Sequence, residues 1–504
     1  MGSVVNQGAL DRPRLWLLFA IIVAVGAIFT GLNIDLPIVR NSFSYAKGAS
    51  ALVENGFDVL AVAQDTVLTA GRPILFSLIA APFVALVGPN AGTIIASAIG
   101  TVFFLCMAAL CLQRLLRHTY DGDRVATVAF ALTALNPLVI YQFWSAHPDS
   151  LFAGFILAAL LLTDIIATEP ARDTRWHIVG LAAVVFLAIH TKFYGIVLGL
   201  ACPVYFLMNW RWLGASTHLR SKITVGAVAA LLLLAMLVLA QLRVYPFLNL
   251  DSGMGVKDYA KGLQAPVVSR VLGVVEQYAL ATALAFHVAL VFLFRSNAWR
   301  VWITAPAVFM FIYLAGLLTY PATGWNMRYL LPVFPWIAAS IAMGASTFQP
   351  RARLSILSAY AVVGAISVLL FNSAPFHRML QPLVGEALGR RDTQLLLDSL
   401  RLPSQLELAE QIDYLNRHLE KSSTLFWVSD YYGSATHGLG HELGLRSDIQ
   451  IEYLFSFSQI PPSTHPTFVL RYGAEPSPGD VPDWARITTL RHSLPSSVLR
   501  LDPL

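Results

Sequence analysis

The stretch from residue 15 to residue 32 reads LWLLFAIIVAVGAIFTGL and contains no charged side chain. Its length approaches the roughly 20 apolar residues that an α-helix needs to span a bilayer. Arg12 and Arg14 precede this stretch, and further apolar stretches follow it as far as residue 371. Because many spans follow, we interpret residues 15–32 as a signal anchor with a cytoplasmic N-terminus and not as a cleaved signal peptide.

The composition of the chain is typical of a membrane protein. Of its 504 residues 56% are hydrophobic and only 12% are charged, and the mean hydropathy is +0.63. A soluble domain has about 25% charged residues. The C-terminal region has no basic cluster, which argues against a nucleic-acid partner. The three cysteines of the chain, Cys106, Cys111 and Cys202, lie in apolar stretches, which disfavours a disulfide framework or a zinc site.

The apolar segments predict an all-α polytopic membrane protein with about 11–13 transmembrane helices. They cover residues 15–32, 73–88, 91–112, 125–141, 149–167, 178–191, 193–209, 223–243, 271–294, 301–319, 328–347 and 354–371. The short connections rich in arginine are assigned to the cytoplasm, and the loops between them to the outer side. Residues 73–88 contain Pro82 and are expected to be re-entrant or tilted, because the charge pattern requires an odd number of crossings.

Two domains are expected. Residues 1–371 form the transmembrane domain, and its first outer loop, 33–72, contains a short amphipathic helix at 43–53 that lies on the membrane. Residues 372–504 form a soluble outer domain. Within it we predict a helix over 394–420 and strands over Thr424–Ser429 and Thr467–Arg471, which together favour a small α/β fold. His437 and His441 are four positions apart and could chelate a metal from one helix face, but they lack the His-Glu-x-x-His pattern, which argues against a metalloprotease.

Two carboxylates lie at the expected outer ends of apolar segments. Asp35 follows the first segment, and Asp149 follows His147-Pro148 at the start of the segment 149–167. Charges near the lipid are costly, which favours a function for those that persist, and either acid could remove a proton from an acceptor hydroxyl. The alternatives are a solvated helix end for Asp35 and a helix cap for Asp149. His147 is interpreted as an acid/base candidate or as an interfacial histidine.

Three cations lie on the same expected outer side, against the positive-inside bias. They are Arg72 before Pro73, Lys192 between two apolar segments, and Arg328 at the start of another. Such side chains hold phosphate groups by charge-assisted hydrogen bonds, so they are candidates for binding a lipid phosphate. The alternative for each is snorkelling to the lipid headgroups.

The order of these features resembles that of the GT-C glycosyltransferases, in particular the bacterial relatives of the protein O-mannosyltransferases and of the aminoarabinose transferase that acts on lipid A. The segments that carry the resemblance are Tyr45–Gly56, Ala70–Phe76, Asn136–Tyr141, Ala146–Ser150, Thr191–Gly195 and Arg328–Pro335. The resemblance covers most of residues 15–371. Counted back from Leu52–Gly56, the acidic pair usual in the family would fall at Asn41-Ser42, where this chain has no acid.

The resemblance implies a GT-C-like membrane domain with a small C-terminal α/β periplasmic domain, in a multi-pass protein of the bacterial inner membrane. It also implies a polyprenyl-phosphate-linked sugar donor and a lipid, glycan or protein acceptor, in contact with membrane lipids. No nucleotide is needed, which agrees with the lack of a Walker loop in the sequence. The sequence requires no cofactor.

The mechanism implied by the resemblance is a single inverting displacement on the periplasmic side. Asp35 or Asp149 removes the proton of the acceptor hydroxyl, which attacks the anomeric carbon of the sugar. The three outer cations stabilise the leaving phosphate. His147 and Asn41 are further candidates for an acid/base or acceptor contact.

Two other functions stay open. A glycolipid transporter or flippase would use the same charges as substrate or ion sites, although the sequence shows no paired hydrophobic halves of an inverted repeat. A catalytically inactive GT-C-like scaffold would account for the absence of acids at Asn41-Ser42.

Overall fold

The computed structural model describes residues 8–38, 41–65, 72–116, 122–168, 175–213 and 331–346, scattered positions from 309 to 369, and, in the C-terminal region, 405–429, 444–454, 456–472, 482–493 and 496–503. The chain divides into two compact units. The first comprises Met1–Gly31, Ser97–Trp144 and Pro148–Arg401, and the second comprises Leu32–Ala96, Ser145–His147 and Leu402–Leu504. The domain boundary predicted at residues 371 and 372 lies outside the described residues.

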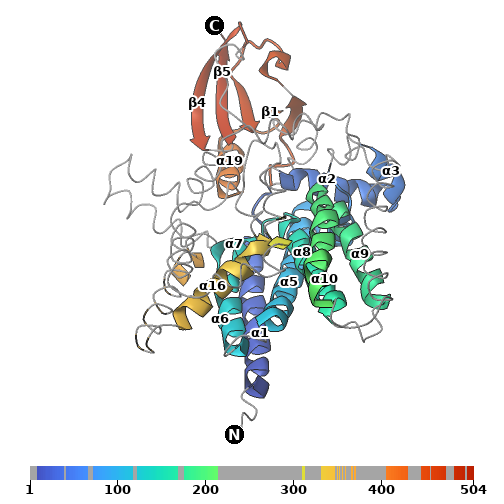
Figure 1. Cartoon of the computed structure of the whole chain (residues 1–504). Helices are drawn as coiled ribbons and strands as arrows, with labels where there is room; N and C mark the ends of the chain where they lie inside the picture. Colours follow the sequence, from blue (N-terminus) through green and yellow to red (C-terminus); the bar gives the residue numbers. More distant parts are fainter. Residues whose placement is uncertain are drawn as a thin grey trace, which may run out of the picture. The chain divides into compact units, whose positions relative to one another are not determined.

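The described residues of the first unit are helical, as Figure 1 shows. Its helices, two of which extend into the other unit, are α1 (Gly8–Asn33), α5 (Pro89–Leu116), α6 (Gly122–Ala134), α7 (Pro137–Gln142), α8 (Asp149–Thr168), α9 (Arg175–Thr191), the 3-10 helix η1 (Phe193–Val197), α10 (Leu198–Leu213) and α16 (Phe334–Ser346). Among the described residues, three stretches are helices long and apolar enough to cross a membrane: Arg14–Asn33, Pro89–Leu116 and Asp149–Thr168. Helices are thereby confirmed at the predicted segments 15–32, 91–112 and 149–167. The segments 223–243 and 271–294 lie outside the described residues, so the predicted number of spans stays a prediction.

The predicted apolar segment 125–141 is two helices and not one. Asn136 separates α6 from α7, and its side-chain oxygen accepts a hydrogen bond from the backbone N–H of Leu138 at 2.9 Å. Pro137 then occupies the first turn of α7, where its missing N–H costs nothing. The local cap chemistry therefore ends one helix and begins the next inside a continuous apolar run.

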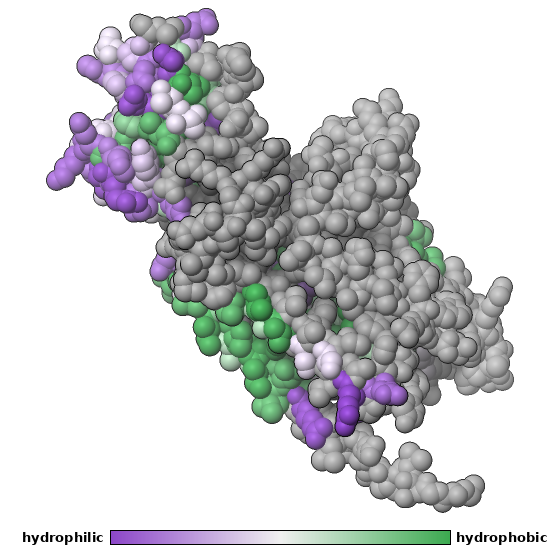
Figure 2. All heavy atoms as spheres, turned by 90° about the vertical axis from the view of Figure 1, so that its left-hand side faces the viewer, coloured by the Kyte–Doolittle hydropathy of each residue, from purple (hydrophilic) through white to green (hydrophobic). Residues whose placement is uncertain are grey.

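Helix α8 is the most buried of the three long apolar helices. In its most apolar window 78% of the residues are buried, against 22% in α1, so α1 exposes an apolar surface suited to lipid. Large exposed side chains of α1 are Trp16, Leu17, Ile21, Ile28 and Leu32. Figure 2 shows hydrophobic side chains gathered over the helical part.

Helices α9 and α10 pack against α8. Helix α5 approaches α8 closely at Gly100, where an added Cβ would lie 3.0 Å from the Cβ of Leu151.

The second unit contains two helices of the predicted outer loop, α2 (Asn41–Glu54) and α3 (Val59–Gln64), and helix α4 (Leu75–Val87) of the apolar segment 73–88. The helix predicted at 43–53 is confirmed as α2; its position on a membrane stays a prediction. Helix α4 packs against α2, where Ser77 Oγ donates a hydrogen bond to the carbonyl of Tyr45 at 2.9 Å.

The same unit contains a five-stranded sheet with the order β2-β1-β3-β5-β4. Its strands are β1 (Thr424–Ser429), β2 (Gln450–Leu454), β3 (Thr467–Tyr472), β4 (Ala485–Ser493) and β5 (Ser496–Pro503). Strands β2 and β3 run parallel to β1, while β5 runs antiparallel to both β3 and β4. The predicted strands β1 and β3 are confirmed, and the predicted α/β fold extends to a mixed sheet with three more strands. One face of the sheet packs around Phe426, Val428, Phe457, Val469 and Leu499.

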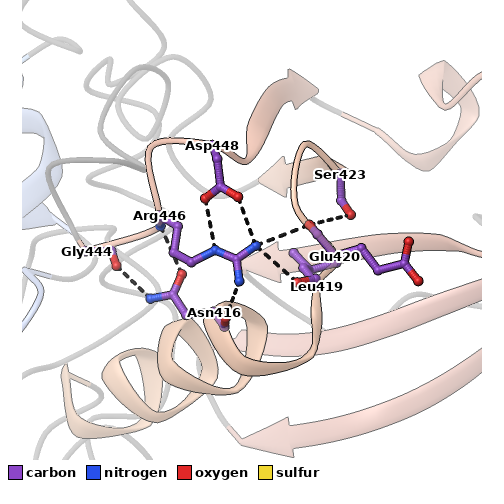
Figure 3. A network of polar contacts seen from close by, with 7 residues as sticks. All are labelled: Asn416, Leu419, Glu420, Ser423, Gly444, Arg446 and Asp448. Atoms are coloured by element: carbon purple, nitrogen blue, oxygen red, sulfur yellow. Dashed lines mark hydrogen bonds and ion pairs between the residues drawn. The ribbon is translucent and has the colours of Figure 1, made fainter.

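Arg446 closes the C-terminal end of helix α19 (Gln405–His418), which packs against β5. Its guanidinium donates hydrogen bonds to the carbonyls of Asn416 at 2.7 Å, Leu419 at 3.1 Å and Glu420 at 3.2 Å, and it also pairs with Asp448 (Figure 3). The last carbonyls of a helix have no partner within the helix, and a cation there also complements the helix dipole. Desolvation acts to raise the pKa of Asp448, but the hydrogen bond and charge of Arg446 outweigh it and hold this pKa below its ordinary value.

We predict that Arg446→Lys exposes the end of α19 in the full-length protein. Lysine keeps the charge but cannot bridge three carbonyls and a carboxylate, and each hydrogen bond to a charged group contributes about 1.5–3 kcal/mol. The measurement is amide hydrogen exchange of peptides covering α19 at neutral pH, where exchange should become roughly 10-fold or more faster. Because the pKa of Asp448 is lowered on folding, its contribution is present above about pH 4 and is lost as the pH falls below that value.

The matched control is Arg417→Lys on the same helix. Arg417 pairs with Asp413 on an exposed surface, with side-chain exposures of 62% and 63%, and such pairs contribute about 0.3–0.5 kcal/mol. Equal exchange rates in the two variants would contradict the capping role of Arg446.

Candidate functional site

A buried ion pair joins two of the predicted site residues in the first unit. Asp149 is the first residue of α8, and Lys192 follows α9 and precedes η1. The ammonium of Lys192 donates to Oδ1 of Asp149, although 43 positions separate the two residues in the sequence. The side chain of Asp149 is only 2% exposed, and that of Lys192 is 11% exposed. The sequence predicted a separate role for each, and the structure brings them together.

Local sequence explains how Lys192 reaches this position. Lys192 has extended backbone angles, φ −152° and ψ 138°, which break the helix between α9 and η1. Gly195 then lies against α9, where an added Cβ would fall 2.8 Å from the Cα of Ile189. Because backbone atoms cannot move aside as a flexible side chain can, only glycine fits at this close approach. The Lys-Phe-Tyr-Gly turn thus folds tightly onto the end of α9 and directs Lys192 toward α8.

A second buried polar cluster lies further along α8. Asp164 pairs with Arg114 of α5 and accepts a hydrogen bond from the hydroxyl of Tyr205 of α10 at 2.7 Å. Arg114 also donates to Thr168 Oγ1 at 2.9 Å. The sequence analysis missed this cluster, although an acid inside the apolar segment 149–167 was a signal for it. From Asp149 to Asp164 is 15 residues, or about 22 Å along a helix, so α8 carries an ion pair near each end of its apolar stretch.

His147 lies in the second unit, in the turn Ser145–His147, and is 2% exposed. Its Nδ1 is 3.1 Å from Oγ of Ser42, the second residue of α2, and that Oγ is 3.2 Å from the carbonyl of Ser145. Ala146, between them, has φ 54°, a left-handed conformation that residues with a Cβ rarely adopt. Ser42 was singled out in the sequence only as a missing acid; in the structure it is a hydrogen-bond partner of His147.

Asp35 lies in the turn after α1 and its side chain is exposed. Asn90 holds this turn: its Nδ2 donates to the carbonyls of Ile34 at 3.1 Å and Leu36 at 2.9 Å, and its Oδ1 accepts from the N–H of Ile38 at 2.9 Å. These hydrogen bonds fix the backbone of the turn, and with it the position of Asp35. The sequence analysis did not identify Asn90, because an amide that binds backbone groups 52–56 positions away leaves no local pattern.

The remaining candidates are placed only in part. Arg72 is half-buried just before α4, and Asn41 is the first residue of α2. Arg328 lies outside the described residues, as do His437 and His441. Within the described part of the chain, no group of three or more His, Cys, Asp or Glu side chains is arranged to hold a metal ion.

Comparison with known proteins identifies the fold. No family model matches the chain, and neither does any curated protein sequence. Among solved structures, ArnT from Cupriavidus metallidurans bound to undecaprenyl phosphate aligns over 96% of this chain and 98% of its own, with a TM-score of 0.55 at 16% identity. The apo state of the same ArnT aligns with a TM-score of 0.52, also at 16% identity, over 96% of this chain and 97% of its own.

These alignments cover nearly the whole chain and show a shared fold. The described part of the chain is mostly helical, with three helices long and apolar enough to cross a membrane and a small C-terminal sheet. The resemblance to the aminoarabinose transferase of lipid A that the sequence predicted is confirmed at the level of the fold, which this chain shares with ArnT.

We predict that Asp149→Asn destabilises the protein by about 3–5 kcal/mol, because it leaves the buried ammonium of Lys192 without its carboxylate. The double variant Asp149→Asn/Lys192→Met should recover much of this loss, since neither partner then leaves a buried charge. The measurement is thermal unfolding of the full-length protein in lipid nanodiscs.

Asp413→Asn is the control, because it removes the acid of the exposed pair with Arg417 and should change stability by less than about 1 kcal/mol. A double variant as unstable as Asp149→Asn alone would show that the pair does not explain the loss.

Proposed function

We propose that this protein is a membrane glycosyltransferase that moves a sugar from a polyprenyl-phosphate donor to a lipid, glycan or protein acceptor on the periplasmic side of the bacterial inner membrane. The observation that carries the proposal is the buried pair of Asp149 and Lys192, in a fold shared with a protein whose structure contains undecaprenyl phosphate. Burying a cation in an apolar helix bundle is costly. A phosphate-bearing lipid is a ligand that could bind such a cation by charge-assisted hydrogen bonds.

The chemistry is a single displacement that inverts the anomeric centre. The oxygen of the acceptor hydroxyl forms a bond to the anomeric carbon, the bond from that carbon to the phosphate oxygen breaks, and the electron pair leaves with polyprenyl phosphate. Positive charge next to that oxygen stabilises the transition state more than the ground state. Lys192 supplies this charge, Arg72 and Arg328 are its proposed companions, and Asp149 holds Lys192 in place.

The acceptor hydroxyl must also lose a proton. Asp35 and Asp149 are the carboxylate candidates for this step, with His147 and Asn41 as further candidate contacts to the acceptor. The ion pair engages one oxygen of Asp149, which supports its role as the partner of Lys192. Asp35 is exposed at the end of α1, where a carboxylate can meet an acceptor that comes from the aqueous side.

The proposal is tested by offering the purified full-length protein, in lipid nanodiscs, a panel of polyprenyl-phosphate sugars with candidate acceptors. The readout is the release of free polyprenyl phosphate. Release with a particular donor is expected. Lys192→Met should lower the rate by about 100-fold or more, the usual effect of losing one group that stabilises developing charge.

The matched control is Asp58→Asn in the first outer loop. Asp58 is an exposed N-cap of α3 that accepts from the N–H of Ala61 at 3.0 Å, and asparagine caps a helix equally well, so full activity is expected. Well-folded protein that releases no polyprenyl phosphate from any donor would refute the proposal and favour a transporter or an inactive scaffold.

A further inference from the structure

Two consecutive residues of α5, Gly100 and Thr101, hold the two residues that follow Asp149 on α8. All of them belong to the first unit. Oγ1 of Thr101 and Oγ of Ser150 form a hydrogen bond of 3.0 Å, and both residues are fully buried. Beside this bond, a Cβ added to Gly100 would lie 3.0 Å from the Cβ and 3.2 Å from the backbone nitrogen of Leu151. A hydrogen bond and a close backbone approach thus fix the first turn of α8 against α5.

Thr101 does not need Ser150 in order to satisfy its own hydroxyl. A threonine in a helix can donate to the carbonyl four residues earlier, and Thr101 donates in this way to Ser97 at 2.9 Å. The bond to Ser150 is additional, and it joins α5 to α8 at the residue next to Asp149. Moving Ser150 about 1 Å away from Thr101 would break this bond. The bond therefore reports, and helps to fix, the position of the start of α8.

Further contacts of α5 restrict the same region. One turn earlier on α5, Oγ of Ser97 donates to the carbonyl of Gln142, the last residue of α7, at 2.7 Å. One turn further along α8, Gly154 lies against the ring of Phe103, where an added Cβ would be 2.4 Å from Cδ1. Helix α5 thus contacts both the end of α7 and the beginning of α8. The position of Asp149 is set by these contacts as well as by its ion pair.

We propose that Gly100 and Thr101 are positioning residues for the buried pair of Asp149 and Lys192. The inference rests on the proposed function. Gly100 and Thr101 place the first turn of α8. Asp149, at the start of that turn, holds the ammonium of Lys192, and the ammonium stabilises the charge that develops on the departing phosphate oxygen. A misplacement of about 1 Å can lower a rate by roughly 100-fold, so this contact of α5 affects the rate although neither residue takes part in the chemistry.

The test uses full-length variants in lipid nanodiscs, assayed by the release of polyprenyl phosphate. Thr101→Val keeps the shape of the side chain but removes the hydroxyl, and kcat should fall by about 10-fold or more. The KM for the donor should change by less than about threefold, because Lys192 acts mainly on charge that develops in the transition state. Thr101→Ser keeps a hydroxyl and should keep kcat. Gly100→Ala should lower kcat by a factor similar to that of Thr101→Val, because its Cβ presses on the backbone of Leu151.

Two variants serve as matched controls. Thr133 of α6 is 1% exposed, and among the described residues its hydroxyl bonds only within its own helix, to the carbonyl of Ala129 at 2.8 Å. Gly180 of α9 faces Leu162, where an added Cβ would lie 3.6 Å from Cδ1, an ordinary contact. Thr133→Val and Gly180→Ala should therefore leave kcat unchanged. Equal losses of kcat in Thr101→Val and Thr133→Val would overturn the inference.

A cycle of unfolding measurements tests the positioning without any activity. If Thr101 holds the pair in place, Thr101→Val and Asp149→Asn disturb the same contact. The double variant should then lower the midpoint of thermal unfolding by less than the sum of the two single shifts. Thr133→Val combined with Asp149→Asn should give the sum, because Thr133 bonds within its own helix. Additive shifts in both combinations would contradict the positioning role.

The outcomes separate this inference from the proposed function. If the unmodified protein transfers a sugar and Thr101→Val does so with the same kcat, Thr101 does not position the pair, although the protein is a glycosyltransferase. If the unmodified, folded protein releases no polyprenyl phosphate from any donor, the proposed function falls, and the effect on kcat falls with it. The unfolding cycle then decides by itself whether Thr101 holds the pair.

Discussion

The cost of burying charge among apolar helices organises the first unit. Helix α8 has 20 residues and contains two acids, Asp149 and Asp164. Each is paired with a cation from another part of the chain, Lys192 after α9 and Arg114 on α5. An unpaired charge in such surroundings would cost several kcal/mol, so these pairs fix the neighbours of α8 at both ends of its apolar stretch. Tyr205 of α10 adds a third neighbour through its hydrogen bond to Asp164.

The same requirement acts through neutral groups in the second unit. Asn90 satisfies three backbone groups of the turn that carries Asp35, and Ser42 satisfies a carbonyl and a ring nitrogen of the turn that carries His147. In each case one short polar side chain fixes the backbone on which a candidate site residue stands. Rigid support of this kind is what catalytic groups need in order to keep their geometry. The sheet region uses a longer side chain for the same purpose, since Arg446 satisfies the end of α19.

The two ion pairs of α8 are similar in structure but differ in their surroundings, and therefore in whether they suit the binding of a ligand. The pair of Arg114 and Asp164 is completed by Tyr205 of α10 and by Thr168 of α8 itself, as in a structural contact between helices. The pair of Asp149 and Lys192 lies where a helix begins and another is interrupted by an extended residue. Interrupted helices place backbone and side-chain polar groups where a ligand can use them. This difference is why the proposed chemistry is assigned to Lys192 and not to Arg114.

The sequence by itself determined the elements whose signal is local. The apolar runs became α1, α5 and α8, and the β-rich runs Thr424–Ser429 and Thr467–Arg471 became β1 and β3. It did not reveal β2, β4 and β5; β2 and β4 form the edges of the sheet, and polar edge strands lack a clear alternation of apolar residues. Nor did it reveal that Asp149 belongs with Lys192, or Ser42 with His147, over separations of 43 and 105 residues. Hydropathy and cap residues act within one or two helical turns, whereas partners for buried charges and hydroxyls are chosen only when distant helices pack together.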